Sequence, residues 1–236
     1  MNSTESSTPP LAPPSRASNP FATCWTCPGA IPFQFPRGES AEQLVSRLAE
    51  QNWWGEIVGP HGAGKSTLLE SLKPLIVAAG QRVLAISLHD RQRRLPSELL
   101  RQVRAQSQML VIVDGYEQLS RFRRLTLRWR CRSTQVGLLI TSHSRTGLPL
   151  LTQLNPDRAV VDSLVATLTA ERPSRITPAD IDASHAVHGS NVRELLFDLH
   201  DRHESARRSN RQATATVTNT ATAPIRLSAA DKCLRC

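Results

Sequence analysis

The sequence contains no long hydrophobic run. No stretch approaches the roughly 20 apolar residues that a membrane-spanning helix needs, and hydrophobic residues make up 39% of the 236 in the chain. The first twenty residues lack both the basic start and the apolar stretch of a secretory signal. We therefore expect a cytoplasmic protein that has no membrane partner.

Cysteine is rare, and its spacing does not form a regular framework. The five cysteines are the CxxC pairs Cys24/Cys27 and Cys233/Cys236, together with Cys131. Two such pairs can supply the four thiolates of one tetrahedral zinc site. However, most of the chain separates them, and the second pair follows a low-complexity tail. We expect ordinary reduced thiols and keep a shared zinc site as the weaker alternative.

No internal repeat is present, which argues against a solenoid. Residues 1–22 are rich in Ser, Thr and Pro, and residues 205–236 form a polar, low-complexity stretch. Such compositions bury too little apolar surface to offset the entropy of ordering, so we expect two disordered tails. Between the tails we expect an α/β core over residues 30–172 and a helical lid over residues 173–204.

Helical and strand patterns alternate through the predicted core. Helical spacing appears at residues 40–51, with Ser40 as the N-cap, and at 65–80, 95–107 and 117–133. Strand patterns appear at residues 53–59, 82–88, 109–114 and 136–142, with a candidate fifth at 158–164. This alternation predicts an α/β fold: three α/β/α layers, a mostly parallel five-stranded sheet and a small C-terminal helical lid.

The stretch GPHGAGKSTLL, residues 59–69, matches the phosphate-loop pattern GxxxxGK[ST]. Glycines let the loop turn its N–H groups inward, and the following helix adds its positive N-terminal end. Lys65 then reaches the phosphate oxygens, and the Ser66 hydroxyl holds Mg²⁺. The pattern predicts an ATP and Mg²⁺ site in a P-loop NTPase. Its nucleotide-binding residues are Gly59, Pro60, His61, Gly62, Ala63, Gly64, Lys65, Ser66 and Thr67.

The loop alone is similar to that of ABC-type ATPases, but the chain lacks their long helical insert and LSGGQ-like segment. Instead, Asp114 follows Lys65 by 49 positions, a spacing that resembles that of the AAA+ and STAND ATPases. MLVIVDGYEQL resembles the acidic strand of NACHT-type STAND proteins. The resemblance implies that Asp114 orders Mg²⁺ and that Glu117 polarises the attacking water. Alternatively, Glu117 is an ordinary acid at a helix N-terminus.

Two further segments carry the resemblance. VGLLITSHS is similar to the sensor strand of these families, with Thr141 and Ser142 at the polar positions and His143 where STAND proteins have Arg. GSNVRELL is similar to the sensor-2 segment of AAA+ replication initiators, which implies that Arg193 reaches the γ-phosphate. The alternative for Arg193 is a solvent-facing helix position. The catalytic candidates are therefore Lys65, Glu117 and Arg193, and Asp114 and Ser142 join the nucleotide-binding set.

Arginine dominates the positive charge, with 26 residues against 3 lysines in a net charge of +9. Residues 82–132 hold twelve of the arginines and four acids. In the predicted helix over 117–133, apolar residues share one face, which we expect to pack inward while the arginines point outward. The apolar set is Phe122, Leu125 and Trp129, and the arginines are Arg121, Arg124, Arg128 and Arg132. A solvated face, a nucleic-acid contact and an arginine finger all remain open.

Together these features predict an ATP-binding protein that is a slow Mg²⁺-dependent ATPase and acts as a nucleotide-dependent switch or helper. One alternative is an ATP-dependent nucleic-acid-binding module of the transposition-helper type with little hydrolysis. A small-molecule kinase is a weaker alternative, because an acceptor-binding insert is missing. Homo-oligomers, a protein partner and nucleic acid at residues 82–132 remain candidate partners.

Overall fold

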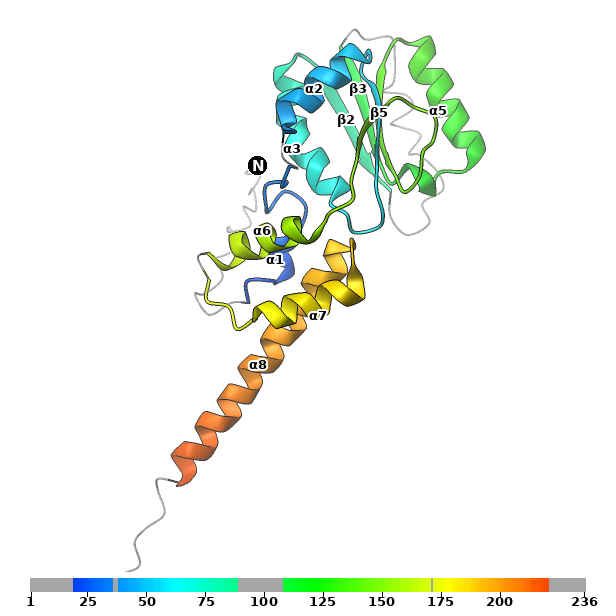
Figure 1. Ribbon diagram of the computed structural model, residues 1–236. Coiled ribbons are helices and arrows are strands. Elements are labelled where there is room, and N and C mark those ends of the chain that lie inside the picture. Colours follow the sequence, from blue (N-terminus) through cyan, green and yellow to red (C-terminus); the bar gives the residue numbers. More distant parts are fainter. Residues whose placement is uncertain (1–18, 36–37, 89–107, 171, 221–236) are drawn as a thin grey trace, which may run out of the picture.

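The computed structural model describes residues 19–35, 38–88, 108–170 and 172–220 (Figure 1). The strands are β1 (Trp54–Val58), β2 (Arg82–Ser87), β3 (Met109–Asp114), β4 (Gly137–Ser142) and β5 (Leu150–Gln153). The helices are α1 (Thr23–Thr26), α2 (Ala41–Glu50), α3 (Lys65–Ala78), the 3-10 turn η1 (Tyr116–Gln118), α5 (Arg121–Ser133), α6 (Arg158–Thr169), α7 (Pro178–His188) and α8 (Val192–Thr220). The helix predicted over 95–107 lies outside the described residues.

All five strands run parallel, in the order β2-β3-β4-β1-β5. Val58 pairs with Ser142 and Ser87 pairs with Asp114, so the polar strand ends meet at one edge of the sheet. This confirms the predicted α/β fold class. The carboxyl edge of such a sheet is where ligands of open α/β folds bind.

Separate apolar clusters cover the two faces of the sheet. On one face, α2 and α3 pack over β1, β3 and β4, and Leu44, Leu68 and Ile112 are buried there. On the other face, α5 and the link from β4 to β5 bury Val111, Leu127 and Leu148. Figure 1 shows α3 and α5 on opposite sides of the strands. Burial on both faces explains the continuous apolar sequences of the central strands.

The candidate fifth strand at residues 158–164 is wrong. These residues form the start of α6, and the fifth strand is β5, immediately before it. The Asp157 side chain accepts a hydrogen bond from Val160 N at 3.0 Å and so caps the helix. Val161, Leu164, Val165 and Leu168 are buried at helical spacing. The adjacent residues Val160 and Val161 suggest a strand, but the buried residues of the whole segment recur with the spacing of a helix.

The helical unit has its own core and is larger than predicted. Figure 1 shows α6, α7 and α8 grouped below the sheet. Buried side chains from α6 and α8 surround Phe21, which is fully buried although it falls in the predicted tail 1–22. α8 also continues to Thr220, beyond the predicted limit of residue 204. Local composition does not reveal the burial of Phe21, because its apolar neighbours lie far along the chain.

Helix α5 has the opposite orientation from the one predicted. Leu127 and Cys131 are its buried residues, whereas Phe122, Leu125 and Trp129 are exposed. Arginines fill the inner flank. Arg128 Nε donates to the Tyr116 hydroxyl at 3.1 Å, and Arg124 donates to the carbonyls of Leu119 and Glu117 at 2.9 and 2.7 Å. These carbonyls of the 116–119 turn need donors, so the turn draws Arg124 inward, while the Tyr116 hydroxyl holds Arg128.

Candidate nucleotide site

The phosphate loop lies between the carboxyl end of β1 and the start of α3. Gly62 and Gly64 adopt φ of +73° and +90°, a region that favours glycine. A Cβ on Gly59 would lie 2.9 Å from the carbonyl oxygen of Leu154. Because α3 starts at Lys65 without a side-chain cap, its first N–H groups face the loop. This combination makes a socket for an anion.

Lys65 reaches back over the loop from the first turn of α3. Its Nζ donates to the carbonyl oxygens of Gly59 and Pro60, each at 2.7 Å. Burial lowers the pKa of Lys65, the carboxylates of Glu117 and Asp114 oppose this shift, and the charge of Arg193 reinforces it. Glu117, Asp114 and Arg193 therefore all act on Lys65 at the loop.

Asp114 connects the loop to the two neighbouring strands. Its Oδ2 accepts from the Ser66 hydroxyl at 2.6 Å, and its Oδ1 accepts from the Thr141 hydroxyl at 2.5 Å. Thr141 Oγ1 in turn accepts from Gly115 N at 2.8 Å. Hydroxyl and carboxylate oxygens are ligands that Mg²⁺ prefers. Ser66 and Asp114, predicted separately from the sequence, are thus brought together as a fitting pair of Mg²⁺ ligands.

Glu117 lies on the 3-10 turn after β3, not on the helix that the sequence predicts from this residue. Its Oε1 is 3.2 Å from His143 Nε2, and its Oε2 is buried without a hydrogen-bond partner in the described part of the chain. The ring of His61, from the phosphate loop, lies edge-on to His143 with 5.7 Å between centroids. The loop, the acidic turn and the end of β4 therefore meet at this carboxylate.

The two polar residues at the end of β4 differ in role. Thr141 contacts Asp114, as described above, while the Ser142 hydroxyl donates to the carbonyl of Ser144 at 2.7 Å. The sequence pattern favoured Ser142 as a nucleotide contact. The observed geometry makes Thr141 the residue that orders the acidic strand.

The lid contacts the phosphate loop through the start of α8. A Cβ on Gly62 would collide with Asn191 Oδ1 and would lie 3.3 Å from Arg193 Cβ. Asn191 also caps α8, because its Oδ1 accepts from Glu194 N at 3.3 Å. Arg193 is exposed beside this contact. The sequence predicted Arg193 here but missed Asn191, although its place before a helical run is an N-cap signal.

An aromatic residue from the N-terminal segment lies beside the loop. The Phe33 ring is 3.4 Å from the position of a Cβ on Gly64, and Phe33 N donates to the Ser71 hydroxyl at 3.4 Å. The Phe35 ring packs against it edge-on, 4.9 Å between centroids. The proline-flanked pair in PFQFP was the available signal, which sequence analysis treated only as an extended lead-in.

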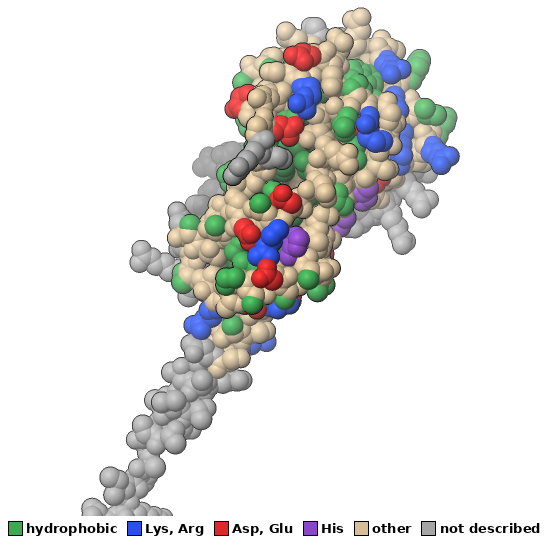
Figure 2. All heavy atoms as spheres, in the orientation of Figure 1, with side chains coloured by type: hydrophobic (Ala, Val, Ile, Leu, Met, Phe, Trp, Pro, Cys, Tyr) green, Lys and Arg blue, Asp and Glu red, His purple; other side chains and the backbone are tan. Residues whose placement is uncertain are grey.

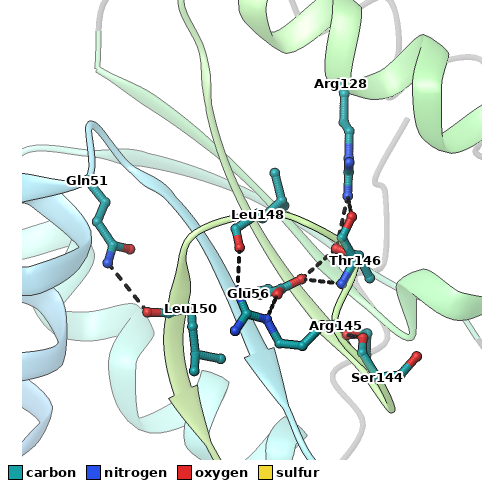
Figure 3. Close-up of polar contacts among 9 residues, drawn as sticks. Gln51, Glu56, Arg128, Ser144, Arg145, Thr146, Leu148 and Leu150 are labelled. Carbon is teal, nitrogen blue, oxygen red and sulfur yellow. Dashed lines mark hydrogen bonds and ion pairs between the residues drawn. The ribbon is translucent and has the colours of Figure 1, made fainter.

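A buried glutamate holds the link between β4 and β5 against β1 (Figure 3). Glu56 is fully buried and forms an ion pair with Arg145. It also accepts hydrogen bonds from Thr146 N at 2.8 Å and Thr146 Oγ1 at 2.6 Å. Arg128 Nη2 donates to the carbonyl and hydroxyl oxygens of Thr146 at 2.8 and 2.9 Å. Sequence analysis missed Glu56, although a lone acid inside an apolar strand signals a buried polar contact.

No zinc cluster appears among the described residues. They contain no group of three His, Cys, Asp or Glu side chains placed to hold a metal ion. Cys24 and Cys27 are exposed free thiols, and burial raises the pKa of the Cys131 thiol to about 12. Cys233 and Cys236 lie outside the described residues, so the shared zinc site stays an untested alternative. Within the described part of the chain no helix is long and apolar enough to cross a membrane.

Comparison with known proteins gives structural neighbours. No protein-family model and no curated protein matches the sequence. The structure is similar to that of AMPPCP-bound DnaA from Aquifex aeolicus: TM-score 0.50, 17% identity, with 69% of this chain and 60% of that chain covered. A replication initiator DnaA bound to AMPPCP and single-stranded DNA matches with TM-score 0.52 and 16% identity, over 85% of this chain and 75% of that chain. The chain thus has the fold of the AAA+ P-loop NTPases.

Proposed function

We propose that the chain binds ATP with Mg²⁺ at the phosphate loop, hydrolyses it slowly, and couples the nucleotide to the position of the lid. One observation carries this proposal. Lys65, the Ser66–Asp114 pair and Glu117 meet at one edge of the sheet, and Asn191 of the lid contacts the same loop. The nucleotide-bound DnaA neighbours support it at the level of the fold.

Binding follows from the groups on the loop. The first N–H groups of α3 face an anion, and Lys65 supplies a cation whose present partners are two loop carbonyls. Exchanging these carbonyls for phosphate oxygens replaces neutral acceptors with charged ones, which form stronger hydrogen bonds. Ser66 and Asp114 would hold Mg²⁺, which neutralises phosphate charge when it is bound. Arg193 lies beside Gly62 and supplies a further positive charge.

Slow hydrolysis follows from the position of Glu117. A carboxylate must accept a proton from water to assist its attack. One oxygen of Glu117 is paired with His143, whereas the other has no protein partner in the described residues. Oε2 is buried and can accept that proton only when a water reaches it, and Oε1 already contacts His143. We therefore expect a low turnover rate that depends on Glu117.

Measuring ATP binding and turnover in three variants tests the proposal. Lys65→Ala should weaken ATP binding at least about tenfold, because it removes the cation at the loop. Glu117→Gln should retain ATP binding and lose most of the turnover. Lys73→Ala is the matched control, since Lys73 lies on the same helix but pairs with Glu70 at the surface. Unchanged binding in Lys65→Ala would contradict the site, and unchanged turnover in Glu117→Gln would contradict the role of Glu117.

A second candidate function is ATP-dependent nucleic-acid binding with little hydrolysis. The arginine-rich composition favours it, because clustered guanidinium groups bind phosphates. Retention of single-stranded DNA that requires ATP, with turnover absent in the wild type, would replace the first proposal with this one. Phosphate transfer to an added small alcohol would instead indicate a kinase.

A further inference from the structure

We propose that the outward face of α5 docks an acidic amphipathic helix of a partner protein. Phe122, Leu125 and Trp129, here called the α5 stripe, are 74%, 66% and 70% exposed. Their spacing places them in one row that extends about 10 Å along the helix. A row of three large apolar side chains on one helix face is a typical docking surface for another helix.

The α5 stripe does not serve the core of the protein. Leu127 and Cys131 already fill the inward side of α5, and Arg124 and Arg128 fill its inner flank. The other large exposed hydrophobic residues in the described part of the chain are single residues on three different helices, Val77, Val187 and Phe197. Single exposed residues are ordinary, but a contiguous set marks an interaction surface.

Charge determines which partner fits. No Asp or Glu occurs from residue 118 to residue 156, a stretch that contains seven arginines. Arg121 and Arg132 border one side of the α5 stripe, three or four residues from its members, whereas Thr126 and Ser133 border the other side. Arg121 forms no ion pair with a described carboxylate. Figure 2 shows blue and green side chains interleaved on the α5 side of the molecule. The complement is an apolar row flanked by acids.

Neither the same face of a second copy nor the sequence outside the described residues offers such a complement. A second copy docked through the same face would place arginines opposite arginines. Outside the described residues, 89–107 carries five arginines and two acids, and 221–236 carries three basic residues and one acid. Residues 1–18 carry one acid and one arginine and few large apolar residues. The occupant is therefore another protein.

A helix also fits better than a nucleic acid. Bases stack on aromatic side chains, which Phe122 and Trp129 would supply, but Leu125 lies between them in the row. A row that mixes aromatic and aliphatic side chains matches the apolar face of a helix. Each turn of the docked helix would then contribute one apolar residue to the contact. The arginines then pair with the acids beside that face.

Two designed peptides test the proposal by fluorescence anisotropy with the full chain. Both are labelled 21-residue amphipathic helices with the same leucine face; one carries Glu at the flanking positions and the other carries Lys. We expect the Glu peptide to bind and the Lys peptide to bind at least about tenfold more weakly. Leu125→Glu should weaken binding of the Glu peptide by a similar factor. Val187→Glu is the matched control, because Val187 is 73% exposed on α7, and it should leave binding unchanged.

Several results would overturn the proposal. These are no binding of the Glu peptide, equal binding of both peptides, or equal effects of Leu125→Glu and Val187→Glu. A labelled oligothymidine that binds in a Leu125-dependent way, without binding of the Glu peptide, would assign the face to nucleic acid. A dimer in sedimentation that Leu125→Glu dissociates would assign it to a second copy. Circular dichroism checks the fold, and Trp129→Glu replaces Leu125→Glu if that variant unfolds.

Discussion

At the scale of single residues, Glu56 shows how a buried charge can organise a connection. The described link from β4 to β5 passes over β1 and contains no helix, although the connection between two parallel strands usually contains one. Glu56 compensates by binding both the backbone and the side chain of Thr146, as well as Arg145. Since β1 leads directly into the phosphate loop, the same contact fixes the strand that carries the site.

Replacing Glu56 by Gln should lower the free energy of unfolding by about 2–4 kcal/mol, because it removes a buried charge that satisfies several donors. Urea unfolding followed by circular dichroism measures the change. Glu70→Gln is the matched control: among the described residues this exposed glutamate pairs with Lys73, so the expected loss is below about 0.5 kcal/mol. Equal losses in the two variants would show that Glu56 has no special structural role.

At the scale of elements, the sequence predicts what local chemistry dictates. The phosphate loop, Asp114 and the capping of α2 by Ser40 are local patterns, and the structure places each where it was expected. The face of α5 was predicted wrongly because periodicity identifies an apolar row without indicating which side the sheet occupies. Here the turn at residues 116–119 decides, since its carbonyls need Arg124. Asn191 was missed because its contact with Gly62 spans most of the chain.

The lid should be sensitive to acid through His203 on α8. Burial lowers the pKa of His203 below its usual 6.5; a hydrogen bond to the backbone of Pro173 and the charge of Glu204 oppose this shift, and Arg175 and Arg207 reinforce it. The unfolded state therefore binds the proton more readily, and the free energy of unfolding should fall as the pH falls through about 6.5. Phe21, whose ring lies 6.4 Å from that of His203, belongs to the same core.

Comparing wild type with His203→Phe at several pH values isolates this contribution from that of the other histidines. Thermal unfolding should show a smaller loss of stability between pH 7 and pH 5.5 in the variant. Identical pH profiles would mean that His203 keeps the same proton affinity in the folded and unfolded chains. His200→Phe serves as the control, since His200 lies on the same helix and pairs with Asp201 at the surface.

At the scale of the whole molecule, one contact joins the sheet to the lid at the site. Gly62 of the phosphate loop has no side chain, and Asn191 of the lid occupies the space where a Cβ would lie. Any ligand that reshapes the loop must therefore act on the start of α8. Such a contact is what a nucleotide-dependent switch needs, because the ligand must favour one lid position over another.

Gly62→Ala should disturb this contact in two ways, through the positive φ and through collision with Asn191. Gly80→Ala is the matched control, since Gly80 has φ of +86° but no atom within 4 Å of its Cβ position. We expect Gly62→Ala to increase hydrogen exchange in α7 and in α8 up to residue 209, and to weaken ATP binding beyond the control. Because Asn191 also caps α8, Asn191→Ala carries a loss of its own, and we expect the double variant to lose about 1 kcal/mol less than the sum of the two single losses. Strictly additive losses would mean that the two residues do not interact.

The burial of Phe21 has a consequence for how the chain folds during synthesis. Phe21 and Asn19 contact α6 and α8, and Asn19 Nδ2 donates to the carbonyl of His200, 181 residues later. These residues leave the ribosome long before their partners exist. A nascent chain can complete the sheet while the Phe21 side chain still lacks its apolar neighbours. The lid is therefore the last part to close, and chaperones that recognise exposed aromatic residues have their longest access at this segment.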